Sequence, residues 1–305
     1  MVDALSDTGV DREALQRRTL RSLRFAQVPG QAAVAGMVAV VSLLASDLLG
    51  SDRLAGMGSA SFTIGAAFTA IPLAAFMRRR GRRVGLVRAL LIGAVGASIA
   101  ATGGQLRWFP LFVIGMLAFG AGQAATLQQR YVAADLAQPE QQGASIAAIV
   151  WVGTLGAALG PLLTPFEKAA AEQLGLDELV GPFLFAAVFF LVAATVVWTR
   201  LRPDPLEVIG GIDPRAERVR LLRVVRSSAS VIWSSPGARL GIAALAASQA
   251  AMVGVMTMTP PHMKDHGHAD LAALVIALHI VGMYGLSPWV GRFVDRRGAV
   301  RGIQV

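Results

Sequence analysis

Cysteine is absent from this chain of 305 residues, and charged side chains are scarce. The missing thiols exclude disulfides, cysteine nucleophiles and cysteine-ligated metal sites. Charged residues make up 15% of the chain, whereas a soluble domain typically has about 25%. Hydrophobic residues reach 54%, and the mean hydropathy is +0.57. This composition predicts an all-α, polytopic membrane protein.

The sequence motifs of common enzymes are missing as well. No GxSxG elbow, Walker loop or GxGxxG fingerprint occurs in the sequence. We therefore predict no enzymatic activity and no cofactor, and we expect a gradient to drive any transport. Residues 1–27 are polar and rich in arginine, without the apolar core of a cleavable signal peptide. We expect the first spanning segment to act as an uncleaved anchor.

Long apolar stretches recur along the chain, and a helix needs roughly 20 such residues to cross the hydrocarbon core of a membrane. About eight stretches qualify by length and composition. They lie near 28–48, 55–77, 84–104, 109–129, 144–165, 180–200, 240–260 and 270–290. Their many glycines are typical of helices that pack closely in lipid. The sequence therefore predicts a bundle of transmembrane helices.

The basic residues are distributed unevenly between the loops. With the N-terminus in the cytoplasm, only Arg53, Arg107, Lys168 and Lys264 of the 28 Lys and Arg residues fall in outer segments. Positive charge concentrates on the cytoplasmic side of membrane proteins, which supports this orientation and a plasma (inner) membrane location. The pattern also explains the net charge of +9 without any nucleic-acid partner.

A long polar stretch, residues 201–239, separates a six-helix bundle (28–200), preceded by a cytoplasmic segment (1–27), from an incomplete second bundle (240–305). The stretch begins with prolines and glycines and continues with arginines mixed with Val and Leu. This pattern is typical of a linker followed by an amphipathic helix on the anionic inner leaflet. A solvated connector is the alternative.

A short motif follows the last apolar stretch and has a weaker copy earlier in the chain. Its form, G-x-x-x-D-R-x-G, is supplied by Gly291, Asp295, Arg296 and Gly298. The earlier copy keeps Gly81, Arg82 and Arg83, whereas Ala74 and Arg78 stand where the motif has Gly and Asp. Two basic loops of this kind, in corresponding places after membrane helices, indicate two homologous halves.

The paired loops, the six helices and the basic central segment resemble the major facilitator superfamily. This resemblance implies two six-helix halves that rock about a central site, so the chain would contain about eight of twelve helices and be truncated at its C-terminus. It also implies that the loop residues Gly291, Asp295, Arg296, Gly298, Gly81, Arg82 and Arg83 form a conformational latch, a set of charge contacts that favours one of the two states. A basic loop that only sets topology is the alternative.

The fifth apolar stretch contains Gly153, Gly156, Gly160 and Pro161. The form G-x-x-x-G-P resembles part of the motif of proton-coupled drug exporters in the superfamily. A glycine face allows close packing, and a proline kink biases which side of the cavity opens. In the fourth stretch, Met116 replaces the membrane arginine of a second exporter motif. Ordinary helix packing is the alternative interpretation.

Several residues at mid-depth are candidates for a substrate cavity. They are Gln123, Trp151, Gln249, His279, Met283 and Tyr284, and simple helix packing is the alternative for each. Such a lining suits lipophilic solutes, including cations. Asp47 and His279 are candidates for proton coupling, because ionisable residues in membrane helices are costly and therefore tend to be functional. The alternatives are an interfacial residue that faces water for Asp47 and a hydrogen-bonded packing histidine for His279.

A histidine cluster lies in the outer loop between the last two stretches. His262, His266 and His268 are weak candidates for metal ligands, and a polar cap is the simpler interpretation. Together the patterns predict a secondary active transporter in the lipid bilayer that exports small lipophilic or drug-like molecules in exchange for protons or another coupling ion. The alternatives are a facilitator for uptake of a small metabolite, a membrane protein that binds or senses metal through its outer histidines, and an inactive fragment.

Overall fold

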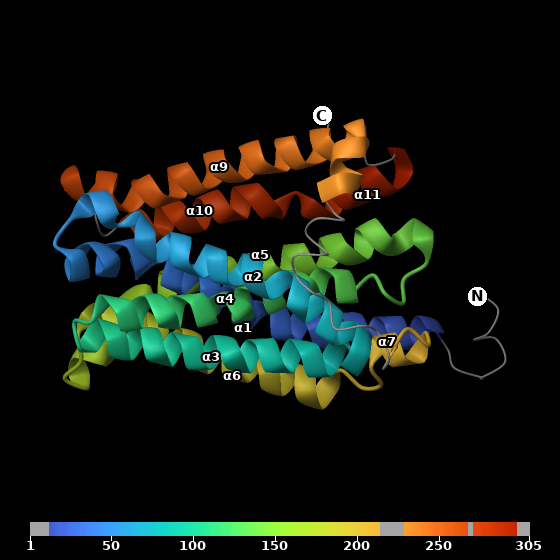
Figure 1. Ribbon diagram of the computed structural model, residues 1–305, viewed down its shortest axis with the longest axis horizontal. Helices are drawn as coiled ribbons and strands as arrows, with labels where there is room; N and C mark the ends of the chain where they lie inside the picture. Colours follow the sequence, from blue (N-terminus) through green and yellow to red (C-terminus); the bar gives the residue numbers. More distant parts are fainter. Residues whose placement is uncertain (1–11, 214–228, 268–270, 298–305) are drawn as a thin grey trace.

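The computed structural model describes residues 12–213, 229–267 and 271–297. Within these ranges the chain is helical with no strand, which confirms the all-α prediction (Figure 1). The longer helices of the first part are α1 (Arg12–Leu49), α2 (Gly56–Arg80), α3 (Arg82–Gln105), α4 (Phe109–Val132), α5 (Gln142–Gln173) and α6 (Gly181–Arg200). Short turns of 3-10 helix are η2 (Asp52–Leu54), η3 (Pro139–Gln141) and η4 (Glu178–Val180). Beyond them lie α7 (Pro205–Val208), α9 (Pro236–Asp265), α10 (Ala272–Gly285) and α11 (Ser287–Arg297).

Among the described residues, 7 helical stretches are long and apolar enough to cross a membrane, one fewer than the sequence predicted. The difference lies in the predicted segment 270–290, which is divided into α10 and α11. Pro288 causes this break, because it has no N–H to donate to the carbonyl of Tyr284 four residues earlier. The hydroxyl of Ser287 donates to that carbonyl instead, at 2.6 Å.

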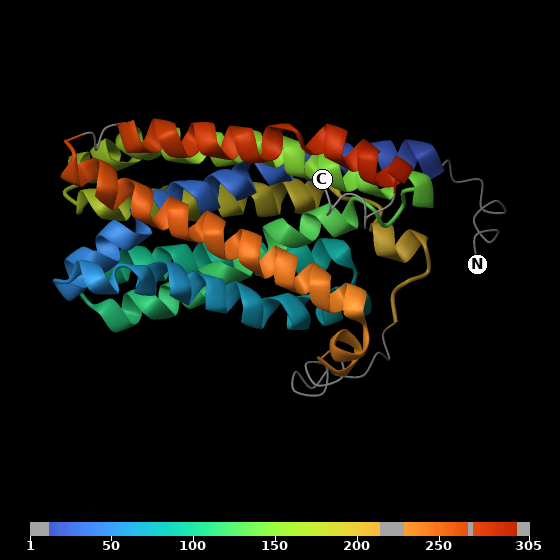
Figure 2. The same ribbon diagram turned by 90° about the horizontal axis from the view of Figure 1, so that it is seen from above.

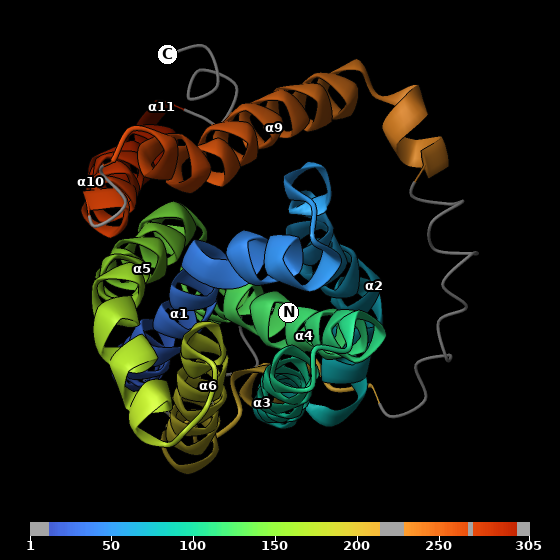
Figure 3. The same cartoon turned by 90° about the vertical axis from the view of Figure 1, so that its left-hand side faces the viewer.

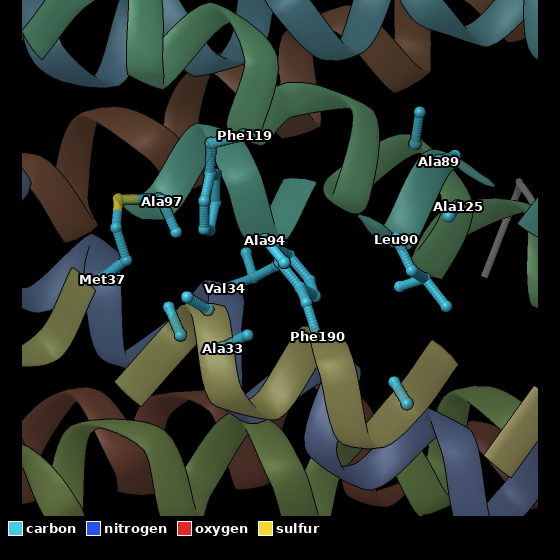
Figure 4. Close-up of a cluster of buried hydrophobic side chains, with 14 of the residues drawn as sticks. Ala33, Val34, Met37, Ala89, Leu90, Ala94, Ala97, Phe119, Ala125 and Phe190 are labelled. Carbon is cyan, nitrogen blue, oxygen red and sulfur yellow. The ribbon is translucent and has the colours of Figure 1, made fainter. Parts of the chain in front are cut away.

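Helices α1 to α6 form one bundle around a continuous apolar core. Helix α4 packs against α2 and α3, and α1 packs against α5 and α6. Phe119 of α4 and Phe190 of α6 lie in this core with ring centroids 5.0 Å apart, next to Ala94 of α3 (Figure 4). A second aromatic pair, Phe112 and Phe183, lies 5.7 Å apart. Large rings fill the space between small side chains, which explains how glycine- and alanine-rich helices still share an apolar core.

Two features at the ends of the helices depart from simple expectation. Helix α1 begins, within the described residues, at Arg12, so the boundary that we predicted at residue 28 falls inside this helix. Helices α2 and α3 are joined by the single residue Gly81, whose φ of +92° strongly favours glycine. This abrupt turn sends α3 back antiparallel to α2.

The C-terminal helices form a separate layer beside the six-helix bundle (Figures 2 and 3). Helices α10 and α11 lie along α5, and α9 packs on α10. A small apolar cluster at this interface contains Ala157 of α5, Ile276 of α10 and Met256 of α9. Helix α5 therefore contacts α1 on one side and the C-terminal helices on another. The predicted amphipathic helix lies mostly in residues 214–228, outside the described ranges.

Candidate functional site

The basic turn after α2 is held by an acidic residue from another part of the bundle. Arg82 donates from its guanidinium to both carboxylate oxygens of Asp135, with distances of 2.9 Å from Nε to Oδ2 and 3.1 Å from Nη2 to Oδ1. The two side chains are only 15% and 13% exposed. A two-pronged contact of this kind fixes the geometry of both partners. It ties the start of α3 to the segment that follows α4.

A second carboxylate, Asp204, reaches the same turn from the segment after α6. Its Oδ2 accepts a hydrogen bond from the backbone N–H of Arg83 at 2.7 Å, and its Oδ1 accepts from the N–H of Leu206 at 2.9 Å. Asp204 therefore caps two helices at once, α3 and α7, where unpaired N–H groups favour an anion. A Cβ on Gly81 would lie 2.5 Å from Asp204 Oδ2. Glycine is therefore favoured here both by its φ angle and by the close approach of the Asp204 carboxylate.

These two carboxylates were not identified from the sequence. The motif position that would hold an acidic residue is Arg78, whose carbonyl accepts from the N–H of Asp213 at 3.0 Å. Asp135 and Asp204 lie 53 and 121 residues from their partners Arg82 and Arg83, too far for any local pattern to connect them. The Asp-Pro pair at 204–205 is nevertheless a helix-start signal that could have indicated the cap.

The ionisation of Asp135 is perturbed in this environment. Burial raises the pKa of its carboxyl, while the hydrogen bond and the charge of Arg82 pull the pKa down, and the charge of Asp204 adds to the rise. The pair is therefore sensitive to the loss of either partner. This segment lies between α4 and η3, at the end of the bundle that we expect to face the cytoplasm.

The second copy of the motif is largely helical. Gly291, Asp295 and Arg296 belong to α11, and Arg296 is exposed. The first copy behaves alike, because residues 74–80 end α2 and only Gly81 makes the turn. Gly298 is the position that corresponds to Gly81 in the first copy. It lies outside the described residues, and so does any latch contact made through it.

The glycine face of α5 is packed directly on the backbone of α1. A Cβ on Gly156 would overlap the carbonyl oxygen of Val28, and one on Gly160 would lie 2.6 Å from the carbonyl oxygen of Ala32. Pro161 follows in the same helix and is buried. The exporter-like residues therefore lie at the α1–α5 contact, where the two backbones approach more closely than any side chain would permit.

An acidic side chain continues this contact toward the far end of α5. Glu167 is 1% exposed, and its Oε2 has no hydrogen-bond partner among the described residues. A Cβ on Gly36 of α1 would lie 3.6 Å from that oxygen. The sequence prediction missed Glu167 because it ended the fifth segment at residue 165. The spacing of seven residues from Gly160, which places both on one helix face, was the available signal.

The cavity candidates lie in different environments. Gln123 is half-buried and its Oε1 has no partner among the described residues. Tyr284 is half-buried against Ala157. Trp151 is 44% exposed, and Gln249 and His279 are exposed. The side chain of Met283 lies outside the described part of the structure.

The remaining candidates lie near the end of the bundle that we expect to face outside. Asp47 forms an ion pair with Arg107, which also approaches Asp177 at 3.3 Å. His262 and His266 are exposed on α9, with His266 Nδ1 2.9 Å from the carbonyl oxygen of His262. His268 lies outside the described residues. Within residues 12–213, 229–267 and 271–297, no group of three side chains is arranged to hold a metal ion.

Comparison with known proteins agrees with this architecture. The bundle of membrane-length helices, with its basic turn and glycine-packed contact, is that of a multi-pass membrane transporter. Residues 26–305 match the family model of the Major Facilitator Superfamily, and the chain belongs to that family.

Relatives and a solved structure of this class cover most of the chain. The uncharacterized MFS-type transporters YddS and YdeG of Bacillus subtilis (strain 168) are 35% and 36% identical, over 96% and 94% of this chain and 67% of each relative. The riboflavin transporter RfnT of Brucella anthropi is 29% identical over 92% of this chain and 68% of its own length. The crystal structure of the human organic anion transporter MFSD10 (TETRAN) shares the fold, with a TM-score of 0.64, 18% identity, and coverage of 92% of this chain and 73% of that one. The chain thus spans about two thirds of the curated relatives that it matches.

Proposed function

We propose that this member of the superfamily is a secondary active transporter that exports small lipophilic molecules in exchange for protons. The observation that carries the proposal is the α1–α5 contact, where Gly156, Gly160 and Pro161 place two helix backbones together without intervening side chains. The glycine face holds α5 closely on α1, and a proline kink in a helix that also contacts the C-terminal layer would bias which side of the cavity opens when the two halves rock. The sequence contains no Walker loop, so a gradient is the source of energy.

Efflux of ethidium, a lipophilic cation, from cells that express the full-length protein tests this proposal. We expect the cells to retain several-fold less ethidium than cells without the protein, and we expect an uncoupler of the proton gradient to remove the difference. Depletion of ATP with the gradient maintained serves as the control and is expected to have little effect. Efflux that persists unchanged in the presence of the uncoupler would contradict proton exchange.

Uptake of a small metabolite is the second candidate function. It is favoured by the relative named as a riboflavin transporter, which aligns with 92% of this chain. Cells that lack riboflavin synthesis and express the protein would then accumulate labelled riboflavin from the medium. Riboflavin uptake without ethidium efflux would replace export by this alternative.

The proposed location is the plasma (inner) membrane, with the N-terminus in the cytoplasm, and the uneven distribution of arginine supports it. These 305 residues contain no cysteine, so a single introduced cysteine is the only thiol among them that can be labelled. Glu140, just before α5, and Glu172, near its end, are both exposed. In intact cells a membrane-impermeant maleimide is expected to label Glu172→Cys at least tenfold faster than Glu140→Cys. Permeabilised cells, in which both should react, are the control, and the opposite preference would reverse the proposed orientation.

A further inference from the structure

Glu167 lies on the same face of α5 as the glycines that touch α1. It follows Gly160 by seven residues, which is close to two helical turns. Thr164, between them, donates from its hydroxyl to the carbonyl of Gly160 at 3.4 Å and is also buried. The helix face that packs on α1 therefore changes from glycine to a carboxyl group as it approaches the end of α5.

The surroundings of Glu167 provide little compensation for a negative charge. Residues 28–46 of α1 and 181–199 of α6 contain no ionisable side chain. A Cβ on Gly181, the first residue of α6, would overlap the backbone carbonyl of Glu167, so α6 closes this side of the site. Lys168 is the next residue along α5, but its ammonium pairs with Glu178 of η4 at 3.0 Å.

More distant titratable groups are engaged elsewhere or lie on other surfaces. Asp47, at the end of α1, is paired with Arg107. On α10, His279 is exposed and Tyr284 packs near Ala157, ten residues before Glu167 on α5. Within the described part of the chain, no ion pair or hydrogen bond reaches Glu167 Oε2.

A glutamate in this position is costly, since an ionisable group inside a membrane helix must be paired, neutralised or functional. Its place on α5 provides a role, because α5 contacts both α1 and the C-terminal helices. The carboxyl group is shielded from water in this structure, and movement of α5 as the two halves rock would open Oε2 to one side of the membrane in one state and to the opposite side in the other. A group that alternates in this way can take up a proton in one state and release it in the other, which couples proton movement to rocking.

We propose that Glu167 is the proton-binding group that couples the transport cycle to the proton gradient. The carboxylate accepts a proton from water that reaches Oε2 on one side of the membrane in one state of the cycle, forming an O–H bond, and the same bond breaks when the other state opens Oε2 to water on the opposite side, which takes up the proton. No electron transfer or further reactant is involved. This inference rests on the proposed function, because it assigns the residue that performs the proton step of that exchange.

The test uses the full-length protein in liposomes that contain a pH-sensitive dye, with ethidium as the transported probe. Wild-type protein is expected to move protons when ethidium is added, and Glu167→Gln, which removes the titratable group with little change of shape, to reduce this movement at least tenfold. Ethidium-for-ethidium exchange needs no change of protonation and is expected to persist. Glu172→Gln, the same substitution at an exposed position of the same helix, is the matched control and is expected to behave as wild type.

The outcomes separate the two proposals. If wild-type protein moves ethidium without moving protons, the proposed proton exchange fails, whatever Glu167 does. If wild-type protein couples the two and Glu167→Gln still does so, the assignment of Glu167 is overturned. Should Glu167→Gln lose exchange as well, Glu167→Asp decides: a carboxyl on a shorter side chain is expected to retain coupling with a shifted pH profile of transport. An unchanged profile, or no coupling in a folded Glu167→Asp protein, would also overturn the assignment.

Discussion

Replacing Gly156 with alanine is expected to destabilise the folded protein by about 3 kcal/mol, near the upper end of what overpacking usually costs. The added methyl group would overlap the carbonyl oxygen of Val28, a backbone atom that cannot move without shifting all of α1. Because the α1–α5 pair makes one of the most extensive helix contacts of the six-helix bundle, disordering this contact is also expected to stop transport. Thermal unfolding in detergent and ethidium efflux measure the two effects.

The matched control for this substitution is Gly254→Ala in α9. A Cβ there meets no atom within 4 Å, and alanine favours a helix by up to about 1 kcal/mol over glycine. We expect this variant to be as stable as wild type or slightly more so. Equal melting temperatures for Gly156→Ala and wild type would show that the backbones of α1 and α5 do not approach each other this closely.

Replacing Arg82 with alanine is expected to destabilise the folded protein by about 3 to 5 kcal/mol at alkaline pH. A loss of this size is typical when one partner of a buried ion pair is removed. The variant leaves the Asp135 carboxylate buried without its cation. Removal of Arg82 also takes away both influences that lower the Asp135 pKa, so this pKa rises further above its ordinary value of 3.8. Protonation then neutralises the group at acidic pH.

The sign of the pH dependence follows from this rise. A carboxyl whose pKa is raised in the folded state stabilises that state less as pH increases, because the unfolded chain ionises more easily. The stability difference between Arg82→Ala and wild type should therefore be smaller at pH 5 than at pH 8. Melting curves at both pH values measure it, and an equal loss at both would contradict the explanation.

A double-mutant cycle with Asp135→Asn isolates the pair itself. The coupling between positions 82 and 135 is expected to be large, since both side chains are shielded from water. The exposed pair Arg17–Glu13, at 3.3 Å and with side chains 68% and 74% exposed, is the control. Exposed pairs contribute little to stability, so Arg17→Ala should leave the melting temperature almost unchanged.

Local patterns in the sequence predicted most of the helices but not their long-range contacts. Apolar stretches and positive loops mark spans, and the glycines at 156 and 160 indicate a close helix contact without naming α1 as the partner. The break before α11 was readable in principle from Ser287 and Pro288, yet hydropathy averages across it. Nothing in the sequence around Asp135 or Asp204 indicates that these side chains contact the turn at Gly81. Such contacts depend on how α4 and α6 end beside α3, which only the packed bundle determines.

Glu167 illustrates a different limit. The apolar stretch was expected to end near residue 165, but α5 continues to Gln173 with both of its prolines inside, although proline disfavours a helix interior. Tertiary packing on α1 and α6 overrides the local preference. An acidic residue that looks like part of a polar loop is consequently buried in a helix, and its chemical meaning changes with its location.

Helix α5 is packed on two sides. The glycines of α5 contact α1, and Ala157 and its neighbours contact the C-terminal helices α10 and α11. A turn of α5 by about 10° about its own axis would move atoms roughly 5 Å from that axis by about 1 Å. Atoms of α5 at the two interfaces would move at the same time and in opposite directions, because the interfaces lie on different sides of the helix axis. The face of α5 toward α1 carries glycines and has few side chains that oppose such a rotation. On the face toward the C-terminal helices, larger side chains interdigitate. Rotation of one helix could therefore transmit the position of the first bundle to the C-terminal layer without bending either.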